Sequence, residues 1–489
     1  MSMGRHKRKG QAQFWIPHGS LPRSPGHPFY QSLGRLLDES GFDAYVESVC
    51  SSYYSADGTQ GRPSIPPGVY FRMLLVGYFE EVRSERGICW RCSDSLSLRE
   101  FIGLQHEQSV PDHSTLSRTR QRYDEVVYTK VFDFALKLVA KAGLLEGRVV
   151  GVDSTYLQAD ASMRAIVRRD SGQDYLDYLK DLARESGIAE PTAEDARRLD
   201  RRRPGKRTSN RDWASPTDPD SRVVRMKDGR TRLGYKAEHV VDLDSGAIVG
   251  AGITLGDSAD TETVVGSVES AAESIDEAQE AAAEEVDRTG SDAEDRQEGS
   301  DEAHPLELVA DKGYHSNGVL SDLTDRGVRT YIPERVAGQR RRWRNKPEGP
   351  RQCRAYHQNR ARIRRSKGKR YQRLRGELLE RSFAHVCETG GGRRVRVRGL
   401  DNVWKSHIMR VVAFNLGLVM RSMYGYGAPR SMAEAISGHL GPLIDLLGRI
   451  LASLNAVMPP RSPFGGHQPD WTPDLKTFPA KLLAAPGAL

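Results

Sequence analysis

The sequence has 489 residues, of which 38% are hydrophobic and 28% charged, enough for two or three domains that bury their own cores. No apolar run approaches the roughly 18 residues of a membrane span, and no signal-peptide stretch follows the basic N-terminus. Five scattered cysteines are too few for a disulfide framework and indicate a reducing compartment. We therefore expect a cytoplasmic protein with no membrane partner.

The net charge of +8 is distributed unevenly along the chain. Residues 335–375 contain seventeen Lys or Arg and a single acid, Glu348, whereas residues 269–302 contain fourteen Asp or Glu and two Arg. Such a basic block attracts a polyanion, because phosphate neutralisation releases counterions. A solvated basic arm has the same composition. The expected partner is DNA, and no small-molecule substrate is indicated.

The first part of the chain predicts a tail followed by helices. Residues 1–30 are rich in Gly, Pro and basic residues and predict a disordered basic tail. Residues 31–145 have helical periodicity, with one helix at Ser97–Ile102 and another capped by Asp112. That last helix carries Arg118, Arg120 and Arg122. Two helices with a short connection outline a helix-turn-helix, so we predict a helical DNA-binding domain. A plain helical bundle with solvated arginines shares the pattern.

The sequence pattern changes from helical to strand-like after Gly147. Short β-branched runs at Arg148–Asp153 and Leu306–Asp311 predict buried strands, and Gly234–Asp242 with Ala247–Thr254 predicts a hairpin. The order of strand, hairpin, helix, strand, helix, strand and helix predicts a mixed α/β fold, the topology of an RNase H-like sheet flanked by helices. The predicted domains are the all-α region at 31–145, a catalytic region at 146–425 with an insertion at about 160–233 and an acidic segment at about 269–303, and a C-terminal helix and Pro/Gly-rich tail at 426–489.

Two acids end predicted strands. Asp153 and Asp311 each follow a short apolar run and precede polar or Gly residues. Acids at the carboxyl ends of strands face the crevice where α/β sheets bind ligands, and carboxylate oxygens are the ligands that Mg²⁺ prefers. Glu380, with Glu377 and Glu388 as competitors, could complete a two-ion site. An Asp after a strand is also common as a turn or helix cap.

These residues resemble the motifs of bacterial insertion-sequence DDE transposases. The first-strand acid motif is similar to Gly151–Thr155, the second to Leu308–Tyr314 and the third to Leu379–Phe383. The hairpin strand around Tyr235 and the helical run Leu98–Arg120 also resemble that family. One departure is Cys387, which stands where the family often places Lys or Arg.

The resemblance implies an enzyme that cuts the ends of a mobile element and transfers the 3′-OH ends into target DNA. Asp153, Asp311 and Glu380 would be catalytic and would hold two Mg²⁺ (or Mn²⁺) ions. The implied partners are the element's terminal inverted repeats, target DNA and a second copy of the chain in a homodimer.

Further residues are predicted to contact DNA. Arg373 and Arg375 precede Glu380 by one to two helical turns and could clamp phosphates. Beside the acids or within the basic block lie Lys312, Tyr314, Arg341, Arg342 and Trp343. Trp343 could stack on an unpaired base. Two alternatives stay open: an RNase H-like nuclease without strand transfer, and a non-catalytic DNA-binding protein derived from a transposase. Cys89 and Cys92 fit buried thiols better than a zinc site.

Overall fold

The computed structural model describes residues 26–54, 64–105, 107–203, 209–289, 305–335, 343 and 348–432, with the backbone alone at 285–289. All of them lie within one compact unit, Met1–Ala435. Most of the predicted N-terminal and C-terminal tails falls outside the described residues, as do Arg341 and Arg342.

The described chain begins with helices, as expected for residues 31–145. They are α1 (Pro28–Glu39), α2 (Phe42–Cys50), α3 (Pro67–Phe79), α4 (Glu85–Asp94), α5 (Leu96–Phe101), α6 (His113–Arg122) and α7 (Glu125–Lys141), with the 3₁₀ turn η2 at Ser51–Tyr53. Pro67 starts α3, where a missing N–H costs nothing. Asp112 caps α6 by accepting from the Ser114 N–H. The helical prediction for this region is confirmed.

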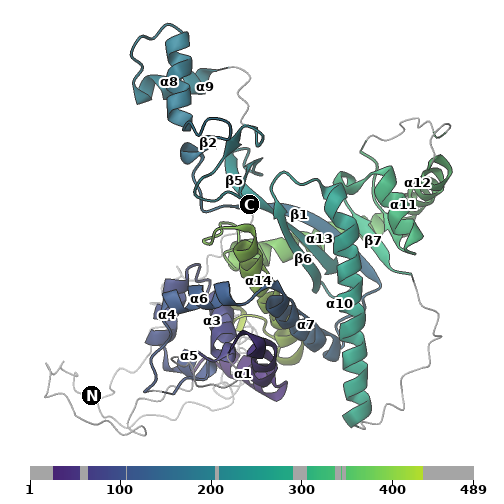
Figure 1. Cartoon of the computed structure of the whole chain (residues 1–489). Coiled ribbons are helices and arrows are strands. Elements are labelled where there is room, and N and C mark those ends of the chain that lie inside the picture. Colours follow the sequence, from purple (N-terminus) through teal and green to yellow (C-terminus); the bar gives the residue numbers. More distant parts are fainter. Residues whose placement is uncertain are drawn as a thin grey trace, which may run out of the picture. The chain divides into compact units, whose positions relative to one another are not determined.

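A mixed sheet follows, ordered β4-β5-β1-β7-β8, with β6 also paired to β5. Its strands are β1 (Val149–Gln158), β4 (Arg222–Arg225), β5 (Thr231–Asp242), β6 (Ile248–Leu255), β7 (Glu307–Ala310) and β8 (Arg329–Tyr331). β1 is central: it pairs antiparallel with β5 and parallel with β7 (Figure 1). The antiparallel pair beside parallel crossovers is the predicted RNase H-like arrangement.

Helices cover the sheet. They are α10 (Asp260–Thr289), α11 (Asn317–Asp325), α12 (Gly349–Arg364), α13 (Ser366–Phe383) and α14 (Leu400–Tyr424), with the 3₁₀ turn η4 at Lys312–Tyr314 and a π-helix, η5, at Ala384–Thr389. α10 and α14 pack against β6 and also against α7, while α13 packs against β1, β5 and β7 (Figure 1). The apolar side chains of α14 therefore join the N-terminal helices to the sheet in one core.

The insertion between β1 and β4 holds a smaller cluster. It contains η3 (Met163–Ala165), the paired strands β2 (Val167–Arg168) and β3 (Trp213–Ala214), and the mutually packed helices α8 (Tyr175–Glu185) and α9 (Ala193–Arg202). The rings of Tyr175 and Tyr178 meet Trp213 edge to face at 5.1 and 5.2 Å between ring centroids. Aromatic packing of this kind gives the insertion an apolar centre of its own.

Candidate active site

Asp153, midway along β1, and Asp311, the residue after β7, lie side by side. The prediction that Asp153 ends its strand is wrong, because β1 continues to Gln158. The parallel register pairs Val152 with Ala310, so that each acid is the next residue along neighbouring strands. Asp311 also raises the pKa of Asp153 through its charge, which reflects their proximity. The predicted meeting of these two acids is thus a property of the sheet.

Asp153 is held by polar contacts on both oxygens. Its Oδ1 accepts from the Ser154 N–H at 2.8 Å, and its Oδ2 accepts from Arg375 Nη1 on α13 at 3.0 Å. Burial raises the pKa of Asp153, and the charge of Arg375 opposes that shift. Arg375 is therefore directed at the acid, where it orients the carboxylate and balances its charge.

Asp260, at the start of α10, is a neighbouring acid that the sequence analysis did not single out. It accepts from Ser154 Oγ at 3.0 Å and pairs with Lys236 of β5 at 2.5 Å. A Cβ placed on Gly313 would lie 2.8 Å from an oxygen of Asp260 and 2.8 Å from one of Asp311. Glycine at 313 lets both carboxylates approach the backbone. The only sequence signal for Asp260 was its position at a helix start.

Glu380 lies on α13, the helix that crosses β1. Leu379, the preceding residue, faces Gly151, where an added Cβ would come within 2.7 Å of the leucine side chain. Glu380 itself is exposed, since successive residues on a helix are rotated by about 100°. In the described part of the chain, no group of three or more His, Cys, Asp or Glu side chains is arranged to hold a metal ion. Asp153 and Asp311 are brought together, and within the described residues Glu380 does not complete a metal-binding group with them.

The residues predicted to contact DNA beside the acids have different surroundings. Lys312 and Arg373 are exposed. The structure contradicts the predicted DNA contact of Tyr314. This residue is 1% exposed, and its hydroxyl donates to Glu238 at 2.9 Å. Its aromatic ring is used in the core, and burial raises the pKa of its hydroxyl further from neutrality. A tyrosine in this position supports the sheet and does not reach a DNA backbone.

The predicted recognition helix, α6, splits its arginines between two sides. Arg118 and Arg122 are exposed, and the guanidinium of Arg122 lies 5.1 Å from the centre of the Tyr54 ring. Arg120 turns inward, pairing with Glu85 and donating to Asn402 of α14 at 3.1 Å. Two of the three arginines are thus free of the core, while Arg120 links α6 to α14.

Trp343 and the cysteines lie in apolar surroundings. The half-buried Trp343 ring lies 5.5 Å from that of Tyr356 on α12, and its stacking on a DNA base stays a prediction. Burial raises the pKa of Cys89 to about 11 and that of Cys92 to about 12. Thiols held this far from ionisation behave as small apolar side chains.

A buried histidine on β5 lies next to Asp153 and pairs with a second buried histidine on α14. His239, the register partner of Asp153 on β5, shares a hydrogen bond of 2.8 Å between its Nε2 and the Nε2 of His407 on α14. Its Nδ1 lies 3.0 Å from Ser382 Oγ on α13. Burial lowers the pKa of His239 far below its usual range and that of His407 to about 3. Both rings are neutral at pH 7 and join β5, α13 and α14.

Comparison with known proteins places the chain in a class. It matches a transposase domain (DUF772) over residues 20–122 and a transposase DDE domain over residues 195–416. Asp311 and Glu380 fall inside the second match, and Asp153 precedes it. No curated protein matches the chain. A solved structure, the "Mos1 transposase paired-end complex with left transposon end", is 11% identical and covers 68% of this chain and 81% of its own, with a TM-score of 0.14.

The mixed sheet with helices on its faces, preceded by a helical region, defines an RNase H-like enzyme core. Both matched families are transposase families, and their order along the chain follows the order of the helical region and the sheet. The chain belongs to the DDE transposases. In the described residues no helix combines the length and apolar character needed to cross a membrane.

Proposed function

We propose that the protein cuts the ends of a mobile DNA element and joins the freed 3′-OH ends to target DNA. The observation that carries this proposal is the adjacency of Asp153 on β1 and Asp311 just after the parallel strand β7, in a chain of the DDE transposase family. The exposed Arg118 and Arg122 of α6 would contact the element's terminal repeats, and two copies of the chain would act on paired ends.

The two acids suit a hard divalent cation. Both offer carboxylate oxygens, the donors that Mg²⁺ and Mn²⁺ prefer, and Glu380 on the adjoining helix is the proposed third ligand. When bound, the metal ions would stabilise the attacking and leaving oxygens of a phosphodiester displacement. Arg375 keeps the Asp153 carboxylate oriented through a contact of 3.0 Å, and the exposed Arg373 and Lys312 would contact DNA phosphates beside the site.

Substitution of Asp153 tests the proposal. Asp153→Asn keeps the size of the side chain and removes its charge. It should leave DNA binding intact and lower Mg²⁺-dependent cleavage by about a thousandfold, since several kcal/mol of transition-state stabilisation would be lost. The substrate is a plasmid that carries the gene with its flanking DNA, and cleavage and joined products are separated on denaturing gels.

Asp276→Asn is the matched control, because Asp276 is exposed on α10. The Asp276→Asn variant should cleave DNA at the wild-type rate. Cleavage by Asp153→Asn at the wild-type rate would exclude Asp153 as a ligand. Cleavage without joined products would assign the chain to the nuclease alternative, and DNA binding without cleavage by the wild type would assign it to the non-catalytic one.

A further inference from the structure

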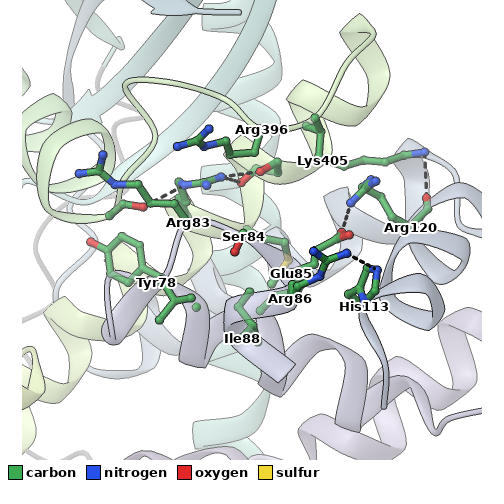
Figure 2. Close-up of a pocket in the computed structure, with 18 of the residues that line it drawn as sticks. Tyr78, Arg83, Ser84, Glu85, Arg86, Ile88, His113, Arg120, Arg396 and Lys405 are labelled. Carbon is green, nitrogen blue, oxygen red and sulfur yellow. Dashed lines mark hydrogen bonds and ion pairs between the residues drawn. The ribbon is translucent and has the colours of Figure 1, made fainter. Parts of the chain in front are cut away.

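A cavity of about 370 Å³ lies between the N-terminal helices and the C-terminal part of the core, formed by α3, α4, α6, α7, α14 and the segment 390–397 (Figure 2). Its lining holds six cationic side chains: Arg83, Arg86, Arg120, Arg396, Lys405 and Arg410. One carboxylate, Glu85, lines it as well. The cavity is thus strongly positive, in a size range typical of ligand sites.

Two of the six cations already have acidic partners. Arg120 pairs with Glu85 (Figure 2), and Lys405 pairs with Asp401 at 2.7 Å. Within the described residues, no carboxylate forms an ion pair with the other four. They are Arg83, Arg86, Arg396 and Arg410. The arginines are therefore in excess of the acids that could neutralise them.

Arg410 is the deepest of these arginines. Its Nε donates to the Gly390 carbonyl at 3.0 Å and its Nη1 to Ser406. Burial lowers the pKa of Arg410, and the charge of Arg83 lowers it further. A half-buried cation beside a second cation is unfavourable unless an anion joins them.

Three consecutive glycines bring the backbone against these side chains. A Cβ on Gly390 would lie 2.5 Å from the Tyr78 ring, one on Gly391 2.8 Å from Arg83 Cγ, and one on Gly392 3.2 Å from Arg410 Cδ. Gly391 also has a φ of +71°, which favours glycine. A side chain at Gly391 would displace Arg83, one at Gly392 would crowd Arg410, and one at Gly390 would displace the Tyr78 ring. The segment Gly390–Gly392 thus shapes the wall of the cavity.

From this arrangement we propose that the cavity is a phosphate-binding site. Guanidinium groups bind phosphate oxygens bidentately. Arg83, Arg86 and Arg396 are exposed at the cavity, where a phosphate can reach them, and Arg410 stands behind them. The excess of positive charge in the cavity favours an anionic ligand over a neutral or cationic one. Two sources have this chemistry: the DNA backbone and free phosphate.

Of these two sources of phosphate, we choose the DNA backbone. This choice rests on the proposed function, in which the protein binds DNA. The chain leaves the glycine segment at Arg393, whose Nη1 donates to Thr155 Oγ1 on β1 at 3.0 Å. Thr155 is two residues beyond Asp153. A phosphate held in the cavity would therefore be tied through one short segment to the strand that carries the first acid.

The test uses the full chain with Arg83→Gln and Arg396→Gln combined. Both side chains are exposed, so the fold should persist, which circular dichroism checks. Binding of a random-sequence duplex of about 30 base pairs is followed by fluorescence anisotropy at several salt concentrations. Loss of one phosphate contact should weaken binding and reduce the slope of log K against log salt by about 0.9. Binding of inorganic phosphate is measured separately by calorimetry.

Arg35→Gln is the control for a simple loss of charge, because Arg35 is exposed on α1 away from the cavity lining. Weaker duplex binding by the double variant, beyond the control, supports a DNA phosphate. Weaker binding of inorganic phosphate alone supports a free phosphate. Unchanged binding of both probes overturns the site. Since cleavage is not measured here, the site can stand even if the wild type fails to cut DNA.

Discussion

At the scale of single residues, the buried pair His239–His407 makes stability depend on pH. Both rings are neutral in the folded protein because burial lowers their pKa values. In the unfolded chain they would titrate near pH 6.5. The unfolded state therefore binds more protons as the pH falls, and folding stability decreases below pH 6.5. Contacts to Ser382 and the stacked ring of Phe383, 4.2 Å away, prevent the rings from turning to solvent.

Urea unfolding at pH 6.5 and at pH 5 measures this effect. We expect the wild type to lose about 1.5 kcal/mol for each of the two rings over that interval, since one proton corresponds to about 1.4 kcal/mol per pH unit. His407→Gln should lose about half as much, whatever its stability at pH 7. His357→Gln, at an exposed position on α12, should keep the wild-type dependence. Equal pH dependence in wild type and His407→Gln would refute the assignment.

At the scale of elements, two helices are attached to the sheet by the same interaction, an asparagine amide that bonds to both backbone groups of one strand residue. Asn359 of α12 accepts from the Ile332 N–H at 2.9 Å and donates to the Ile332 carbonyl at 2.8 Å. Asn415 of α14 does the same with Ile248, at 3.0 and 2.8 Å. Both amides are buried. Each side chain thus replaces a missing strand at the end of β8 or the start of β6.

Asn359→Ala and Asn415→Ala should each lower the free energy of unfolding by about 2–4 kcal/mol, because each leaves a buried N–H and a buried carbonyl without a partner. Denaturant titration measures the change. Gln358→Ala, at an exposed position beside Asn359, should shift the midpoint little. A loss no larger than that of the control would show that water or rearranged backbone satisfies these groups.

Elements were predictable where the pattern is local. The hairpin and the strands that lead to the acids follow directly from periodicity and turn residues. α12 was missed, because its arginines suggested a solvated arm and only Ala355, Tyr356 and Asn359 form a buried face. β1 runs to Gln158, beyond the predicted Asp153, because polar residues continue the pairing with β5.

The site itself was predictable only in part. The sequence predicted that Asp153 and Asp311 meet because each follows a β-branched run, and the parallel register of β1 and β7 brings them together although β1 continues past Asp153. Asp260 comes near them through the long crossover helix α10, and Tyr314 turns inward because Glu238 offers its hydroxyl a partner. Those contacts depend on side-chain directions in three dimensions, which spacing along the chain does not contain. The position of Glu380 relative to the acids stays a prediction.

At the scale of the whole described unit, the N-terminal helices and the sheet share one core. α7 packs against both α10 and α14, and α3 packs against α14. Lys405 of α14 is 3% exposed and donates to the Arg120 carbonyl at 3.5 Å. A helical region that buries its neighbour's side chains in this way should not unfold before it.

Hydrogen exchange in rising denaturant tests this coupling. Peptides from α7 and α14 should lose protection together, because opening either helix exposes the other's apolar face. A chain that starts at Gly147 should lack cooperative unfolding, since the buried face of α14 would lose α7 and α3. Separate exchange transitions, or a stable fragment from Gly147, would show two independent domains.

The central strand β1 has one more consequence. It is bonded along both edges, with nine paired positions toward β5 and four toward β7. A slip by a single residue would break both ladders and send every side chain to the opposite face. Asp153 therefore cannot be repositioned by a local adjustment, because the backbone of β1 fixes the direction in which its side chain points. Any change in the surroundings of this carboxylate has to come from the helices that approach it.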